Sequence, residues 1–107
     1  MSGEVRIERD GKIANVVFDH EKRRNAITVD MWRAIPQAVR EAQDAPDIRV
    51  VVMRGAGSEA FVSGADISEF GKPLREPWLP DLYNVIEASE KIVVSAIHGT
   101  ALGGGFE

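Results

Sequence analysis

The stretch IVVSAIHGTALGGGFE, residues 92–107, joins an apolar, β-branched run to three consecutive glycines and an acid. Glycine has no side chain, so the backbone N–H groups of Gly103, Gly104 and Gly105 can approach a bound atom closely. Where such a loop opens a helix, these N–H groups have no partner within the helix and favour a nearby negative charge. The stretch therefore predicts either a site for a developing oxyanion or a flexible tail, and the glycines alone favour neither.

The composition is that of a single globular domain. The chain has 107 residues, of which 44% are hydrophobic, which allows a modest core. Its formal net charge of −4, without a long basic run, argues against binding to nucleic acid or to an anionic membrane. The absence of cysteine excludes disulfides and thiolate chemistry, and it fits a cytoplasmic location. No apolar run is long enough to span a membrane, so we expect a soluble protein.

The first half of the chain predicts a β-hairpin followed by a helix. Apolar and polar residues alternate over residues 5–18 around an Asp-Gly turn signal. Residues 19–25 are charged and without periodicity, which indicates a loop. Thr28 is a suitable N-cap, and apolar residues recur at helical spacing after it. Pro36 would remove a hydrogen bond from the interior of this helix, so we expect a kink there or a later start.

The second half predicts two further strands separated by helical segments. Residues 48–53 and 92–97 are almost continuously apolar, which is typical of strands buried on both faces. A short helix is expected over residues 66–70, and a longer one begins near Pro80. Strands that alternate with helices imply a layered α/β fold with at least partly parallel pairing.

Both of these strands lead into loops that contain glycine. Ligands bind beyond the carboxyl ends of the strands in open α/β sheets, so Gly64 and Ala65 are expected to face the glycine loop at residues 103–105. Each loop could give one backbone N–H to a single carbonyl oxygen, which is the geometry that stabilises an enolate or a tetrahedral oxyanion. Loss of one such donor typically costs about 2.7–4 kcal/mol in the transition state.

Simpler interpretations compete with this one. Taken alone, Gly64 is an ordinary turn residue, and Asp66 is a helix cap rather than an acid catalyst. Glu107 is a terminal residue, and such residues are usually mobile. The two histidines are isolated in sequence, so no metal site is predicted, and residues 64–72 lack the spacing of a phosphate loop.

Four stretches, in this order and at this spacing, resemble the crotonase (enoyl-CoA hydratase/isomerase) superfamily. They are Asn25-Ala26, VVVMRGAG at 50–57, AFVSGADI at 60–67 and GTALGGGFE at 99–107. The resemblance covers nearly the whole chain and implies an α/β fold of the ClpP/crotonase type, a spiral of ββα units. It also implies that residues 1–107 are the N-terminal part of one such domain, without its C-terminal part and trimerisation helices. Ile92 and His98 stand where the family often has proline and asparagine, and neither difference touches the proposed chemistry.

The resemblance implies a site as well as a fold. The N–H groups of Ala65 and Gly104 would form an oxyanion hole for the thioester carbonyl of an acyl-CoA. Glu107 would align with the first of two catalytic glutamates that hold and activate water. The residues expected to contact the substrate are Lys22, Arg24, Ala26, Ala65, Asp66, Ile67, Ser68 and Gly104.

The activity implied by the resemblance is hydration of trans-2-enoyl-CoA to 3-hydroxyacyl-CoA, a lyase reaction of fatty acid metabolism. It needs a carboxylate to activate water and donors for the enolate oxygen, and no metal or cofactor, because coenzyme A is part of the substrate. The alternatives are an isomerase or racemase-like enzyme that uses Glu107 for proton transfer, or a catalytically inactive acyl-CoA-binding or assembly fragment. The full-length parent is expected to be a homotrimer or a dimer of trimers. A helix that stops at Glu107 is too short to be stable alone, so we expect Gly104 and Glu107 to be poorly held.

Overall fold

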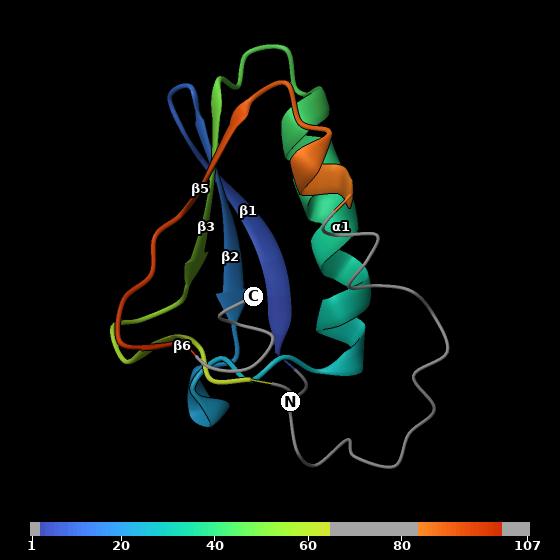
Figure 1. The fold of residues 1–107 in the computed structure, drawn as a ribbon. Coiled ribbons are helices and arrows are strands. Elements are labelled where there is room, and N and C mark those ends of the chain that lie inside the picture. The colour runs from blue at the N-terminus through green and yellow to red at the C-terminus, as the bar shows by residue number, and fades with distance from the viewer. Residues whose placement is uncertain (1–2, 65–83, 102–107) are drawn as a thin grey trace.

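The fold is a four-stranded sheet with one long helix along its face (Figure 1). The computed structural model describes residues 3–64 and 84–101. Its elements, in chain order, are β1 (Glu4–Asp10), β2 (Ile13–Asp19), the 3-10 turn η1 (Glu21–Arg23), α1 (Val29–Asp44), β3 (Val50–Gly55), β4 (Ala60–Val62), β5 (Ile92–Ser95) and β6 (Thr100–Ala101).

The sheet has the strand order β1-β2-β3-β5 and is part antiparallel, part parallel. β1 and β2 form the predicted hairpin, in which Asp10 pairs with Ile13. Gly11 lies in the turn between them and has φ +60°. β2, β3 and β5 run parallel to one another. The predicted α/β fold with partly parallel pairing is therefore confirmed, and the carboxyl ends of three neighbouring strands lie at one edge of the sheet.

Helix α1 starts where the sequence predicts, because Thr28 Oγ1 accepts a hydrogen bond from Met31 N at 3.2 Å. The helix continues through Pro36 to Asp44, so of the two expectations at this proline the later start is wrong and the kink stays a prediction. The helix keeps one buried face on both sides of the proline, and tertiary packing of such a face outweighs one missing hydrogen bond. At its other end, Lys91 Nζ donates to the carbonyl oxygens of the last turn, which a cation stabilises.

One core lies between the sheet and α1. Its buried members come from the inner face of the sheet, from the helix and from β4; they are Ala14, Val16, Phe18, Ile27, Met31, Ile35, Val39, Ala42, Ala45, Ile48, Val51, Met53, Phe61, Val62 and Val85. Trp32 is half-buried and packs against this cluster. The rings of Phe18 and Phe61 meet edge to face, 5.5 Å apart, and join β4 to β2.

The two apolar strands differ from the prediction. β3 covers Val50–Gly55 rather than residues 48–53, and its buried residues alternate with half-buried ones because α1 covers only one face. β5 ends at Ser95 and is not buried on both faces, since Ile92 and Val94 are 66% and 42% exposed. Within the part of the chain that the structure describes, β5 has one neighbouring strand, β3, so it forms an edge of the sheet.

The helical segments between these strands are only partly described. Residues 84–87 are helical, as the expected helix near Pro80 requires, and Gln43 Nε2 ties them to α1 by donating to Val85 O at 3.2 Å. Figure 1 shows this short piece lying against α1. The short helix expected over residues 66–70 lies outside the described residues.

Candidate functional site

A second, two-stranded sheet brings the stems of the two glycine-containing loops together. β4 pairs with β6 in parallel, Ala60 with Thr100 and Val62 with Ala101. The chain leaves β4 through Ser63 and Gly64, so it enters both predicted loops from adjacent strands that run in the same direction. The stems of the two loops therefore lie side by side as far as Val62 and Ala101, and the approach of Gly64 and Ala65 to residues 103–105 stays a prediction. The predicted donors and the predicted acid, Ala65, Asp66, Ile67, Ser68, Gly104 and Glu107, lie outside the described residues.

Two glycines allow the chain to turn back closely enough for this pairing. A Cβ built on Gly55, at the end of β3, would lie 2.7 Å from Asn25 Nδ2 and closer still to the carbonyl oxygens of Ala60 and Phe61. Gly99 has φ +61°, and a Cβ there would lie 2.7 Å from the carbonyl carbon of Glu59. At both positions a side chain would occupy the space that the neighbouring backbone fills.

The segment between β2 and α1 lies alongside β4 and the residues that follow it. Ile27 N donates to Gly64 O at 2.8 Å, and Ser63 N donates to Arg24 O at 3.2 Å. Ser63 Oγ also lies 3.2 Å from the carbonyl oxygen of Arg23, to which it donates. The segment that contains the predicted binding residues Lys22, Arg24 and Ala26 is thus joined by hydrogen bonds to the stem of the first loop.

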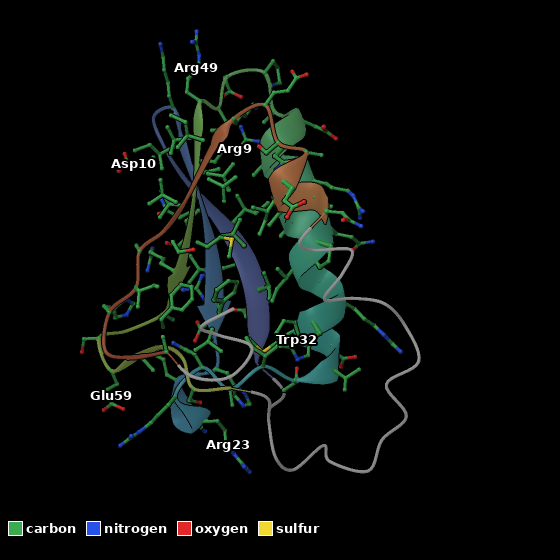
Figure 2. All side chains as sticks on the ribbon, viewed as in Figure 1. Arg9, Asp10, Arg23, Trp32, Arg49 and Glu59 are labelled. Atoms are coloured by element: carbon green, nitrogen blue, oxygen red, sulfur yellow. The ribbon has the colours of Figure 1, made fainter. Side chains whose placement is uncertain are left out.

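The three predicted binding residues of this segment differ in exposure. Lys22 and Arg24 are exposed, and Figure 2 shows neighbouring Arg23 and Glu59 at the opposite end of the molecule from Asp10. Arg24 Nε approaches Glu59 Oε2 at 4.0 Å, a long and solvent-exposed pair that contributes little. Ala26 is buried, its N–H donates to Arg23 O, and its carbonyl oxygen lies 2.9 Å from His20 Nδ1.

A shallow polar pocket of about 220 Å³ opens next to this segment, between it and the loop that joins β3 to β4. Its lining is Glu21, Arg24, Asn25, Ala56, Gly57, Ser58, Glu59 and Ala60. Of these residues, the sequence singled out only Arg24 as a candidate for binding. The pocket carries two carboxylates and one guanidinium, so its own charge does not favour an anion.

Both histidines use their rings for structure. His20 Nδ1 lies 2.9 Å from Ala26 O, and because a carbonyl oxygen only accepts, the ring donates through Nδ1. His98 places Nδ1 3.2 Å from Ala96 O and Nε2 3.2 Å from Gly57 O, so its ring contacts backbone carbonyls of its own loop and of the loop between β3 and β4. Among residues 3–64 and 84–101 no three His, Cys, Asp or Glu side chains gather as a metal site would require.

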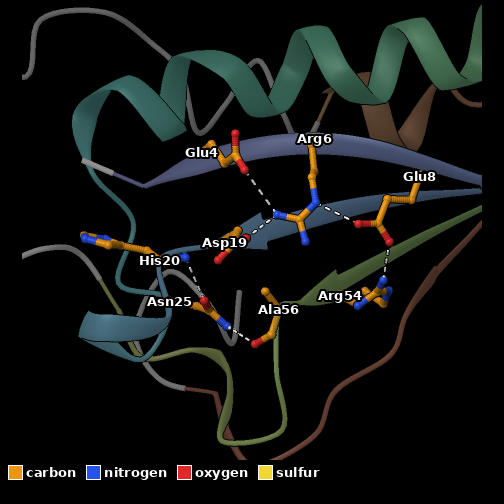
Figure 3. A network of polar contacts seen from close by, with 8 residues as sticks. All are labelled: Glu4, Arg6, Glu8, Asp19, His20, Asn25, Arg54 and Ala56. Carbon is orange, nitrogen blue, oxygen red and sulfur yellow. Dashed lines mark hydrogen bonds and ion pairs between the residues drawn. The ribbon is translucent and has the colours of Figure 1, made fainter. Parts of the chain in front are cut away.

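Among the described residues, a network of ion pairs joins side chains of β1, β2 and β3 (Figure 3). Arg6 Nε lies 2.7 Å from Glu8 Oε2, and Arg54 Nη2 lies 2.6 Å from the other oxygen of Glu8; Arg6 also pairs with Asp19. The hydrogen bond from Arg6 lowers the pKa of Glu8, and the same bond raises the pKa of Arg6 above its ordinary value. This network stabilises charged forms across three strands and requires no ligand.

Comparison with known proteins connects these features to one family. Residues 8–107 match the sequence model of the family described as enoyl-CoA hydratase/isomerase. The chain is 47% identical over 83 residues to a peroxisomal bifunctional enzyme of Danio rerio, a match that covers 78% of this chain and 11% of that protein. It is 33% identical over 112 residues to a crotonyl-CoA hydratase of Syntrophomonas wolfei, covering 94% of this chain and 41% of the relative.

Solved structures show the same likeness. A putative enoyl-CoA hydratase/isomerase family protein from Hyphomonas neptunium superimposes with a TM-score of 0.85 at 38% identity, over 94% of this chain and 42% of that one. The predicted crotonase-like fold is thereby confirmed. The chain spans less than half the length of the curated relatives it matches. In the part of the chain that the structure describes, no helix is long and apolar enough to cross a membrane.

Proposed function

The chain belongs to the enoyl-CoA hydratase/isomerase family, and from that premise we propose that it binds an acyl-CoA thioester and hydrates a trans-2-enoyl-CoA to the 3-hydroxyacyl-CoA. The observation that carries the proposal is the parallel pairing of β4 with β6. It places the entries to the two predicted donor loops side by side at the carboxyl edge of the sheet, where α/β folds bind their ligands.

The hydrogen bond from Ile27 N to Gly64 O supports the direction of the first proposed donor. In a planar trans peptide the carbonyl and the N–H that follows it point in opposite directions. In the proposed site, the Gly64 carbonyl faces Ile27 and the next N–H, that of Ala65, faces the thioester oxygen on the other side. Together with the N–H of Gly104, it would hold the thioester oxygen between two fixed donors, each worth about 2.7–4 kcal/mol in the transition state.

The proposed reaction adds water across the C2–C3 double bond. Glu107 accepts a proton from water, the water oxygen bonds to C3, and the electron pair of the double bond moves onto the thioester oxygen as an enolate. C2 of the enolate then takes a proton from a partner acid, which completes the addition. The resemblance places that acid beyond residue 107. The proposed chemistry uses no metal or redox cofactor, since coenzyme A belongs to the substrate.

The exposed cations before α1 support contact with the rest of coenzyme A. Lys22 and Arg24 are exposed, the backbone of Arg24 bonds to Ser63, and both side chains are suited to phosphate. We assign the phosphates to these two side chains, and we assign the surface beside Ala26 to the pantetheine. The acidic pocket lined by Glu21 and Glu59 is a poor place for the same phosphates.

The family description also covers isomerases, so a second candidate is proton transfer within the acyl chain by Glu107. An inactive acyl-CoA-binding or assembly role is the third, because the chain spans only part of its relatives. Assembly into a homotrimer or a dimer of trimers and a cytoplasmic location stay predictions from the resemblance.

The test is hydration of crotonyl-CoA by this chain, followed by the loss of absorbance of the conjugated thioester. We expect turnover above background, and we expect Glu107→Gln to abolish it while crotonyl-CoA still binds. Glu90→Gln, at an exposed glutamate beyond the site, is the matched control and should leave turnover unchanged. Binding without hydration in the unsubstituted chain would contradict the hydratase assignment, and absence of binding would contradict an acyl-CoA function altogether.

A further inference from the structure

Asn25 has an unusual backbone conformation and a buried polar side chain. Arg24 and Asn25 follow one another at φ +52° and φ +56°, the left-handed region that few residues other than glycine adopt. Asparagine is among the residues that tolerate this region best. The turn leaves Arg24 exposed and Asn25 only 1% exposed. Such strain persists only where the surroundings hold it in place.

The side chain of Asn25 joins three separate parts of the chain. Its Oδ1 accepts from His20 N at 2.9 Å, at the end of β2. Its Nδ2 donates to Ala56 O at 3.0 Å, after β3, and to Ala60 O at 2.8 Å, at the start of β4. Figure 3 shows the bonds to His20 and Ala56 converging on one amide. Only one orientation of the amide satisfies one N–H and two carbonyls, so both of its donor hydrogens and an acceptor are used.

The neighbours of Asn25 hold the other end of the same segment. Arg24 O accepts from Ser63 N, and Ile27 N donates to Gly64 O. Residues 24–27 therefore bind residues 60–64 at both ends, with the Asn25 amide at Ala60 and the backbone of Ile27 at Gly64. Asn25 and Ile27 are two residues apart in the same tight turn, and they bind Ala60 and Gly64 respectively. A displacement of Asn25 would therefore also displace the Gly64 carbonyl.

We infer that Asn25 is a positioning residue: its amide fixes the segment 60–64, from which the chain enters the first proposed donor loop. This inference rests on the proposed acyl-CoA function for its purpose, but the geometric part stands without it. Asn25 itself is buried and has its hydrogen bonds within the protein, so it acts through Gly64 and contacts no substrate.

The experiment compares Asn25→Gly with Asn15→Gly. Glycine accepts the left-handed backbone at residue 25, so this variant removes the amide without adding strain. Asn15 lies within β2, opposite Glu8 of β1, and its Nδ2 donates a long hydrogen bond of 3.3 Å to Glu8 O. Its replacement therefore loosens the hairpin without removing a contact to the segment 60–64. Asn25→Asp keeps the size and the acceptor but sets a carboxylate against the carbonyl oxygens of Ala56 and Ala60, so it disturbs the segment 60–64 more strongly than Asn25→Gly.

We expect the amides of Ile27 and Ser63 to exchange with solvent about tenfold faster or more in Asn25→Gly and in Asn25→Asp than in Asn15→Gly. In crotonyl-CoA hydration, kcat should fall about tenfold or more in both Asn25 variants with little change in KM, because only the transition state uses the fixed donor. Unchanged exchange at both amides would overturn the inference, as would an equal fall of kcat in Asn15→Gly. If the unsubstituted chain does not turn over, the proposed function fails for this chain, and amide exchange still decides the role of Asn25.

Discussion

Replacing Gly99 with alanine tests the pairing of β4 with β6, and the matched control is the replacement of Gly11 with alanine. Gly99 and Gly11 have almost the same backbone conformation, φ +61° and φ +60°. A Cβ at Gly99 would lie 2.7 Å from the carbonyl carbon of Glu59 and closer to its oxygen, whereas a Cβ at Gly11 would meet nothing within 4 Å. The two substitutions therefore share the backbone strain and differ in the steric clash.

The magnitudes follow from this geometry. A left-handed conformation costs an alanine about 1–2 kcal/mol, and this applies at Gly11 and Gly99 alike. At Gly99 the backbone of Glu59 must also shift, because its carbonyl carbon would lie 2.7 Å from the new Cβ. Forced displacements in packed regions cost about 1–3 kcal/mol. We therefore expect Gly99→Ala to lower the free energy of unfolding by about 1–3 kcal/mol more than Gly11→Ala does.

The assay is urea unfolding of both variants and of the unsubstituted chain, with the slope of each transition checked for a common value. Gly99→Ala should also weaken binding of crotonyl-CoA, which Gly11→Ala should leave intact. Equal destabilisation by the two variants would refute the close approach of Gly99 to Glu59, and with it the argument that a glycine is required for the β6 strand to reach β4.

Three further predictions concern the scaffold. Thr28→Ala removes the acceptor for Met31 N at the start of α1 and should lower the free energy of unfolding by about 1 kcal/mol, measured by urea titration. Ile35→Ala empties a fully buried core position and should cost about 2–5 kcal/mol, whereas Ile92→Ala at an exposed position should stay within about 0.5 kcal/mol; similar losses at both positions would contradict the described core. The lowered pKa of Glu8 means that its ionised form stabilises the fold at neutral pH and that this contribution is lost as the pH falls through the folded-state pKa. The stability advantage of the unsubstituted chain over Glu8→Gln should therefore shrink steadily in acid, and an advantage that grows in acid would show that the sign is wrong.

The larger elements could be predicted from the sequence because each carries a strong local signal. The Asp-Gly turn with alternating residues predicts the hairpin, and Thr28 with its periodic apolar face predicts α1. Pro36 misled the prediction of the helix start, because a local rule does not include the packing of Met31 and Ile35 on the sheet. The exposed outer face of β5 was also missed, since an apolar run shows what a strand can bury and not what lies beside it.

The stems of the site depend on features that leave little trace in a single sequence. β4 and β6 have three and two residues, too few for any periodicity, and they exist because Gly55 and Gly99 let distant backbone segments approach. Asn25 was quoted only as part of a family motif, although its buried amide joins three segments. A polar residue in a charged loop gives no sign of burial, so its role required the fold. The predicted roles of Ala65, Gly104 and Glu107 stay predictions, as does the view of this chain as the N-terminal part of one longer domain.

The most direct measurement of the central claim is the carbon-13 resonance of the thioester carbonyl in labelled crotonyl-CoA bound to this chain. Two fixed N–H donors would draw electron density toward the oxygen, so we predict a downfield shift on binding, which Asn25→Gly should reduce and Asn15→Gly should leave in place. Binding of crotonyl-CoA with an unshifted carbonyl resonance would contradict the account, because the protein would then hold coenzyme A without polarising the bond that has to react.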